Sequence, residues 1–195
     1  MIRGIGFAKI GHDVVADELS IFKERMDSIG VEFFLVAGLC LGLVRDGKPI
    51  EYDKDFDFGV MNEADLQRVI DEIGHFYEEV GIDNRYVRNG AILWLKRYIG
   101  DYCLPMELQA HYVRGESVYY NRALGKTWKF NEARLVWPRH LFENFAKTKF
   151  NGVELNVPNP PEEFLKIHYG SDWKTPKEYT DWRYYCKNIQ QGYWM

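Results

Sequence analysis

The chain has 195 residues, of which 46% are hydrophobic and 28% are charged, a composition typical of a globular protein that buries a sizeable core. Its net charge of −4 argues against binding nucleic acid through a global basic field, and no apolar run approaches the ~20 residues of a membrane-spanning helix. The charge is uneven: residues 1–80 sum to −9 and residues 81–195 to +5. This asymmetry suits a site where metal ions meet an anionic substrate, although solvated helix faces would also produce it.

The cysteines and the N-terminus bear on the compartment. Cys40, Cys103 and Cys186 are widely spaced and odd in number, which indicates free thiols in a reducing environment. The N-terminal apolar stretch is too short and interrupted for a signal peptide, so a cytoplasmic location is expected. We expect a single domain over residues 1–195, with a core of about 10–115 and a C-terminal extension of about 116–195.

The first part of the chain is predicted to alternate between helices and strands. Apolar periodicity predicts a helix over 14–29 that stops at Gly30, followed by a buried strand over 33–37. A short helix then ends near Gly47, and the chain re-enters as a second strand over 48–60. The next helix is expected to start at Asn62 and to carry an apolar stripe of Leu66, Val69, Ile70, Ile73, Tyr77 and Val80.

Beyond Gly81 the pattern favours antiparallel strands. Asn89-Gly90 predicts a hairpin between 85–88 and 91–99, and Asn151-Gly152 predicts another between 145–150 and 153–157. Further strands are expected over 104–113, 117–124 and 127–136, and the Pro160-Pro161 pair opens a last short helix that ends at Gly170. The fold class is therefore α+β: a small mixed sheet flanked by helices, a β-rich C-terminal half and a final short helix.

The most informative segment is E-Y-D-K-D-F-D-F-G, residues 51–59. In an extended chain Asp53, Asp55 and Asp57 would share one face, while Lys54 and the two phenylalanines would share the other. Three neighbouring carboxylates repel one another, so the arrangement is stable only when it is solvated or neutralised by a cation. Carboxylate oxygens select Mg²⁺, Mn²⁺ or Ca²⁺.

Two other interpretations of this segment compete with the metal site. A solvated acidic edge strand is possible, although acidic residues are poor strand formers. A calcium loop of EF-hand type is excluded, because its sixth position would be Phe58 instead of glycine and its twelfth Ala64 instead of glutamate.

The sequence F-L-V-A-G-L-C-L-G-L-V-R-D-G-K-P-I-E-Y-D-K-D-F-D-F-G closely resembles the signature of the LicD/fukutin family. That signature reads roughly G-T-L-L-G-x-x-R, a short loop and I-P-W-D-D-D-x-D. The matching positions are Gly38, Leu41, Gly42, Arg45, Ile50, Asp53, Asp55 and Asp57; the chain departs from it at Leu39, Cys40, Glu51, Tyr52 and Lys54. A second match, ending in Y-G-S-D-W-K-T-P, lies near the C-terminus and contains Tyr169, Gly170 and Trp173.

The resemblance implies a nucleotidyltransferase-like fold and transfer of a phospho-alcohol, such as phosphocholine or ribitol phosphate, from a CDP-activated donor to a hydroxyl, usually of a glycan. Gly38 and Gly42 would form a turn whose backbone amides approach a phosphate. Asp55 and Asp57 would bind the Mg²⁺ or Mn²⁺ that bridges the diphosphate, and Asp53 would support them.

Folds of this kind usually take a further carboxylate from a neighbouring strand, to bind metal or to remove the acceptor's proton. Glu107, in L-P-M-E-L-Q-A, is the candidate, and Asp101 is the alternative. Arg45 would contact phosphate or form a structural salt bridge to Asp53 or Asp57. Either Lys96 or Arg97 would face the site, and Lys96 is the expected phosphate contact.

The expected function is therefore a metal-dependent transferase with a CDP-alcohol or other nucleotide donor and a glycan or small hydroxyl acceptor. A nucleotidyltransferase that moves NMP from an NTP to a small molecule, RNA or protein would use the same fold. A non-catalytic module that binds a glycan or a partner through a degenerate site is the third possibility.

Overall fold

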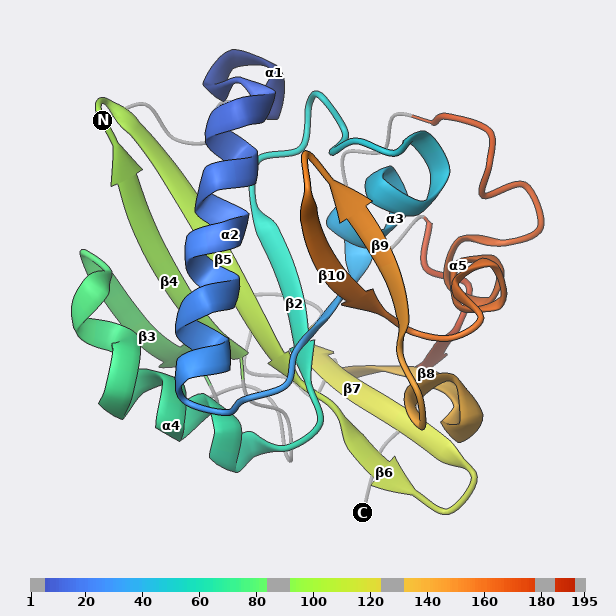
Figure 1. Ribbon diagram of the computed structural model, residues 1–195. Helices are drawn as coiled ribbons and strands as arrows, with labels where there is room; N and C mark the ends of the chain where they lie inside the picture. The colour runs from blue at the N-terminus through green and yellow to red at the C-terminus, as the bar shows by residue number, and fades with distance from the viewer. Residues whose placement is uncertain (1–5, 84–91, 124–131, 178–184, 192–195) are drawn as a thin grey trace.

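The computed structural model describes residues 6–83, 92–123, 132–177 and 185–191 (Figure 1). A five-stranded mixed sheet in the order β1-β2-β5-β4-β3 lies behind helices α2 and α4 in this view. A four-stranded sheet (β11-β8-β7-β6) and the hairpin β9-β10 complete the fold, and the short helix α5 follows the hairpin. The α+β class with a small mixed sheet is confirmed.

The helices are α1 Phe7–Ile10, α2 His12–Ser28, α3 Ala37–Asp46, α4 Glu63–Ile73 and α5 Pro161–Tyr169, with 3₁₀ turns at Gly74–Phe76 and Arg139–Phe142. The strands are β1 Phe34–Leu35, β2 Phe56–Val60, β3 Glu79–Asp83, β4 Ile92–Ile99, β5 Tyr102–Ala110, β6 Tyr112–Arg114, β7 Ser117–Ala123, β8 Glu132–Pro138, β9 Ala146–Phe150, β10 Val153–Val157 and β11 Ile189–Gln191.

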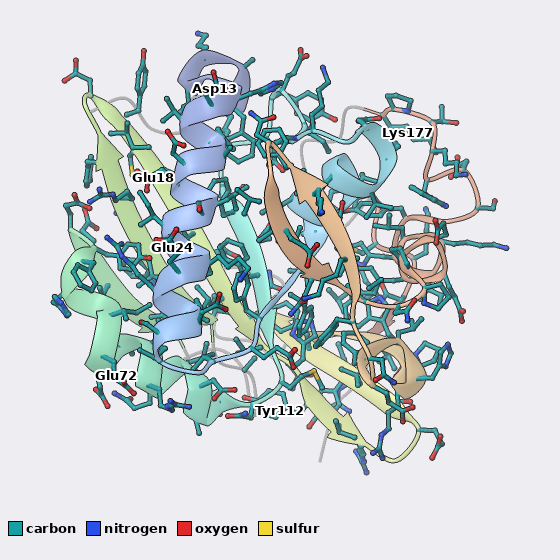
Figure 2. All side chains as sticks on the ribbon, in the orientation of Figure 1. Asp13, Glu18, Glu24, Glu72, Tyr112 and Lys177 are labelled. Carbon is teal, nitrogen blue, oxygen red and sulfur yellow. The ribbon has the colours of Figure 1, made fainter. Side chains whose placement is uncertain are left out.

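One face of the five-stranded sheet carries an aromatic core. Phe58 of β2 stacks on Phe22 of α2 with ring centroids 4.2 Å apart, and Phe33 meets both rings edge-on. Side chains fill the space between α2 and the sheet, whereas Glu24 and Glu72 lie at the surface (Figure 2). The packing of these rings fixes α2 on this face of the sheet, so α2 does not cover the opposite face.

Local signals set most helix boundaries as predicted. Asn62 caps α4, because its Oδ1 accepts a hydrogen bond from the Asp65 amide at 2.9 Å. The predicted extension of this helix to Val80 is wrong: α4 ends at Ile73, Tyr77 has an extended backbone, and Glu79–Asp83 forms strand β3. Pairing with the edge of β4 outweighs the helical spacing of these apolar residues.

The hairpins follow the turn signals. β9 and β10 pair around Asn151 and Gly152, whose φ angles of 44° and 86° explain the Asn-Gly pair. β3 and β4 are antiparallel, but the predicted Asn89-Gly90 turn and the strand over 85–88 lie outside the described residues, as does part of the strand predicted over 127–136. The sequence patterns predicted neither α1 nor β11. Helix α1 has 4 residues and strand β11 has 3, too few to show a periodic pattern.

Within the described ranges, no helix combines the length and the apolar character needed to cross a membrane.

Candidate functional site

The site begins where β1 turns sharply into α3. β1 runs antiparallel to β2, so the end of β1 lies beside the start of β2, and the Val36 amide donates to the Asp57 carbonyl at 3.1 Å. Ala37 then has a φ of 47°, a left-handed value uncommon for a residue with a side chain. This turn brings the first residues of α3 to the loop that leads into β2.

Gly38 is required by close contact with the acidic segment. A Cβ at this position would lie 2.2 Å from Oδ2 of Asp53, so the carboxylate occupies the space that a side chain would need. Gly42 has a different role, because a Cβ there would meet the Lys48 carbonyl oxygen at 2.8 Å and the Ile50 nitrogen at 2.9 Å. Gly38 thus belongs to the site, whereas Gly42 lets α3 pack against the following loop.

The acidic segment is less extended than predicted. β2 starts at Phe56, so the strand predicted over 48–60 is wrong before that residue, and Asp53 and Asp55 lie in a loop. Lys54 is exposed and does not share the buried side of the phenylalanines. Helix α1 holds this loop: the Phe7 amide donates to the Asp53 carbonyl at 2.9 Å. The alternation of side chains along a strand therefore sets the direction of Asp57, but it does not set the directions of Asp53 and Asp55.

The carboxyl group of Asp53 is in an unfavourable environment for a charge. Its Oδ1 accepts from the Lys54 amide at 3.0 Å, while its Oδ2 is buried and makes no hydrogen bond within the described part of the chain. Burial, and next the negative charge of Asp55, raise the pKa of Asp53 to about 7. A bound cation would relieve both effects.

Asp57 and Glu107 form a second carboxylate pair. They are register partners in the parallel pairing of β2 with β5, and both point away from the α2 face that Phe58 occupies. The Gln109 amide group donates to Asp57 Oδ1 at 3.4 Å. Glu107 is half-buried, and the predicted alternative, Asp101, is exposed in the turn between β4 and β5.

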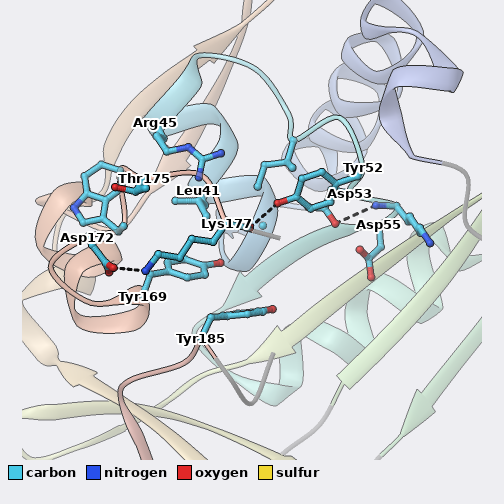
Figure 3. Close-up of a pocket in the computed structure, with 14 residues that line it drawn as sticks. Leu41, Arg45, Tyr52, Asp53, Asp55, Tyr169, Asp172, Thr175, Lys177 and Tyr185 are labelled. Atoms are coloured by element: carbon cyan, nitrogen blue, oxygen red, sulfur yellow. Dashed lines mark hydrogen bonds and ion pairs between the residues drawn. The ribbon is translucent and has the colours of Figure 1, made fainter. Parts of the chain in front are cut away.

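A cleft with a volume of about 710 Å³ opens beside the Gly38 turn (Figure 3). One wall comes from α3 and the loop before β2, and the other comes from the end of α5 and the chain that follows it. Its lining residues are Gly38, Leu41, Arg45, Ile50, Tyr52, Asp53, Lys54, Asp55, Tyr169, Asp172, Trp173, Thr175, Lys177 and Tyr185. Aromatic rings and groups of both charges therefore line it.

Contacts across the rim join the two walls. The Tyr52 hydroxyl donates to the Lys177 carbonyl at 2.9 Å, and Lys177 forms an ion pair with Asp172. Tyr169 stacks on Tyr185 with centroids 5.2 Å apart. Burial chiefly raises the pKa of Tyr169, and the charge of Asp57 contributes to the same shift. Asp57 does not line the cleft, but its backbone carbonyl accepts from the Val36 amide at the turn into α3.

A polar cluster behind this wall anchors Tyr185. The Cys186 sulfur lies 3.3 Å from His168 Nε2, and His168 Nδ1 lies 3.0 Å from Asn188 Oδ1. The Lys187 amide also donates to the His168 carbonyl at 2.7 Å. These contacts fix residues 185–188 on α5 and hold the Tyr185 ring at the cleft.

The predicted cationic residues lie in different parts of the structure and have different ion-pair partners. Arg45 lines the cleft but forms its salt bridge with Asp46, at 2.7 Å, instead of with Asp53 or Asp57, and hydrogen bonding to Asp46 raises its pKa. Lys96 shares a sheet face with Glu107 but forms an ion pair with Glu79 outside the cleft.

Arg97 lies on the α2 face, 3.4 Å from Glu18. Of the predicted phosphate contacts, Arg45 is thus the cation that reaches the cleft.

The four predicted metal ligands form two pairs, one in the loop and one on the sheet. Among the described residues, no three His, Cys, Asp or Glu side chains converge closely enough to hold a metal ion. The all-carboxylate donor set and the buried Oδ2 of Asp53 nevertheless fit a hard divalent cation.

Sequence reasoning missed several cleft residues, including Tyr52, Lys54 and Tyr185. Tyr52 and Lys54 flank the recognised aspartates. Predicting an irregular loop at this position, instead of a strand, would have identified both as candidates for the site. Tyr185 has no recognisable sequence signal, because its position depends on the tertiary contacts of Cys186.

Comparisons with known proteins support one family. Residues 30–160 match the family model described as LicD/FKTN/FKRP, nucleotidyltransferase domain. The human ribitol-5-phosphate transferase FKTN is 24% identical over 196 residues, covering 99% of this chain and 40% of the relative. The human ribitol 5-phosphate transferase FKRP is 25% identical over 156 residues, covering 74% of this chain and 29% of the relative. The chain thus spans less than half the length of these curated relatives.

Proposed function

Because the chain belongs to the LicD/FKTN/FKRP nucleotidyltransferase domain family, we propose that it transfers a phospho-alcohol from a CDP-activated donor to a hydroxyl group of a glycan. The names of its relatives make ribitol phosphate the first alcohol to test. Phosphocholine, which the sequence resemblance implies, is the second. The observation that carries the proposal is the contact of Gly38 with Asp53 at a cleft of nucleotide size.

The donor would bind in this cleft with its diphosphate at the start of α3. Backbone amides at the Gly38 turn would donate to phosphate oxygens, and the positive end of the helix dipole favours their charge. Arg45 and Lys54 add positive charge at the same wall, and Tyr185 and Tyr169 offer stacked rings to the nucleoside. The groove thereby combines contacts for the anionic and the flat parts of one donor.

The carboxylates would hold Mg²⁺ or Mn²⁺. Asp55 and Asp57 would be the principal ligands, and Asp53 would support them. Glu107, the other carboxylate predicted for the metal, would face Asp57 from β5. When bound, such a cation stabilises the negative charge on the attacking and leaving oxygens of a phosphoryl transfer. Binding would also offset the burial and the repulsion that raise the pKa of Asp53.

Glu107 would act as the general base in this proposal. The acceptor hydroxyl would lose its proton to Glu107 as its oxygen forms a bond to the phosphorus that carries the alcohol. The bond from that phosphorus to the bridging oxygen breaks in the same step, and CMP leaves. Glu107 lies one strand from Asp57, so the base and the cation ligand are neighbours on one face of the sheet.

The test is a donor panel. The protein is incubated with CDP-ribitol, CDP-choline, CDP-glycerol and the four NTPs, with Mg²⁺ or Mn²⁺ and an oligosaccharide mixture, and mass spectrometry identifies the products. We expect CMP release from a CDP-alcohol and an acceptor that gains the phospho-alcohol. An acceptor that gains NMP would overturn the proposal in favour of nucleotidyl transfer. Binding of glycan without release of any nucleotide would favour a non-catalytic module.

A further inference from the structure

An exposed tryptophan lies on the face of the sheet opposite α2. Trp94 of β4 is 36% exposed, whereas Leu93 and Leu95 on either side of it are fully buried. Arg97, three residues further along, reaches Glu18 of α2, so its side chain is on the other face. Trp94 therefore shares a face with Glu107, its register partner on β5.

A glycine on the neighbouring strand makes room for the indole. Gly81 of β3 is the register partner of Trp94, and a Cβ on Gly81 would lie 2.5 Å from Cζ2 and 2.9 Å from Cε2 and Cη2 of the ring. The benzene part of the indole thus lies directly against the β3 backbone. An aromatic ring held in this way is fixed in orientation before any ligand arrives, which reduces the entropy lost on binding.

The surroundings of the ring are polar but nearly neutral. The Lys96 ammonium lies 5.5 Å from the ring centroid and forms an ion pair with Glu79. The Tyr98 hydroxyl donates to the same carboxylate at 3.1 Å. An exposed ring with donors and acceptors at its border suits a hydroxylated, uncharged ring, which presents C–H groups to the indole and hydroxyl groups to the border.

The strand register aligns Trp94 with the residues of the proposed chemistry. Trp94 is opposite Glu107, and Glu107 is opposite Asp57, so these residues follow one line across β4, β5 and β2. Adjacent strands lie about 4.8 Å apart. The Trp94 backbone is one strand from Glu107, but the indole leans over β3, which is two strands from Glu107 and three from Asp57, so a sugar ring must reach across β4 to the general base. The donor cleft is lined by α3 and by the loop that leads into β2, the strand of Asp57.

We propose that Trp94 binds a neutral sugar ring of the acceptor and positions its hydroxyl group toward Glu107. This inference rests on the proposed transferase function and specifies which surface receives the glycan. Trp94 is a binding residue in this account, and Gly81 is a positioning residue that sets the orientation of the indole.

The test compares Trp94→Ala, Trp94→Phe and a control, Phe76→Ala, with the unchanged protein. Phe76 is 44% exposed and lies by Arg25 on the α2 side, so its loss should not affect the acceptor. In the transfer assay Trp94→Ala should raise the KM for an oligosaccharide acceptor about three- to tenfold and leave the KM for the donor unchanged. Trp94→Phe should recover most of this loss. An unchanged acceptor KM in Trp94→Ala, or an equal rise in both KM values, would overturn the proposal.

A binding measurement separates this inference from the proposed function. Saturation-transfer NMR with maltose, cellobiose and N-acetyllactosamine, without donor, reports sugar contact whether or not the protein has transferase activity. We expect saturation of at least one disaccharide, with loss of the signal in Trp94→Ala and not in Phe76→Ala. Equal signals in both variants would overturn the role of Trp94, whereas failure of the donor panel alone would overturn only the transferase proposal.

Discussion

The two faces of the five-stranded sheet differ in what they bury. The α2 face carries stacked phenylalanines, and the opposite face carries Asp57, Glu107 and Trp94, with Gln109 and His111 further along β5 and at its end. Both faces come from the same strands by simple alternation. The α2 face therefore contributes apolar packing to the core, and the opposite face holds charged and polar groups.

The polar face itself is not uniform. Near Trp94 and Glu107 it is open or half-buried, whereas Gln109 and His111 are buried, and His111 packs against Tyr120 and Trp137 of the second sheet. Groups at the open end can meet ligands, and groups at the covered end must be satisfied within the protein. The substitutions below test this division.

Asp57→Asn should have the largest effect on function. The substitution keeps the shape of the side chain but removes the charge that we assign to the cation, so transfer should fall by about 1,000-fold or more. Circular dichroism should show a folded protein. Asp101→Asn, at the exposed β4-β5 turn, is the control and should keep full activity. Full activity in Asp57→Asn would show that the site assignment is wrong.

Phe58→Ala should have the largest effect on stability. The ring is fully buried and stacks on Phe22, so its removal leaves a cavity and should lower the free energy of unfolding by about 3–5 kcal/mol. Urea denaturation measures the change. Below its melting temperature the variant should still bind Mn²⁺ and CDP. A loss under about 1 kcal/mol would contradict the role of this face as the core.

His111 should make stability depend on pH. Its Nδ1 donates to the Gln109 carbonyl at 3.0 Å, and complete burial lowers its pKa to about 4. Because this pKa lies below the unfolded value of about 6.5, the folded state binds fewer protons. The stability that neutral His111 contributes is fully present above the unfolded pKa. The free energy of unfolding should therefore fall by about 3 kcal/mol as the pH drops from 7 to 4.

The measurement for His111 is urea denaturation at pH 7 and pH 4. The difference in unfolding free energy between these two pH values should be about 3 kcal/mol smaller in His111→Gln than in the unchanged protein. An unchanged difference would assign the acid sensitivity to other groups.

Gly38→Ala should have the smallest effect, and it should be confined to binding. The new methyl group would displace the Asp53 carboxylate, which lies 2.2 Å from the ideal Cβ, and should weaken CDP binding with Mg²⁺ about tenfold. Calorimetric titration measures this change. Gly42→Ala is the matched comparison, because its methyl group meets backbone atoms and should reduce stability more than binding. The reverse pattern would contradict the separate roles of the two glycines.

The sequence allowed the prediction of features set by short-range patterns. The Asn62 cap, the Asn151-Gly152 hairpin and the buried Phe58 follow from local spacing. The position of Glu107 on a strand next to β2 was expected from the resemblance to the family. The loop at Asp53 did not, because α1 and Gly38 determine its path through tertiary contacts. Residues after Ile73 also escaped prediction, since pairing with β4 decides their structure. The cleft could not be predicted for the same reason, because Tyr185 comes from a distant part of the chain.

The central claim is that the acidic segment and the Gly38 turn together bind a divalent cation and a diphosphate. Electron paramagnetic resonance titration of Mn²⁺, with and without CDP, tests it most directly. We predict saturable Mn²⁺ binding that CDP tightens, and that Asp55→Asn and Asp57→Asn each weaken at least tenfold. Binding of Mn²⁺ and CDP by both variants with unchanged affinity would contradict the account.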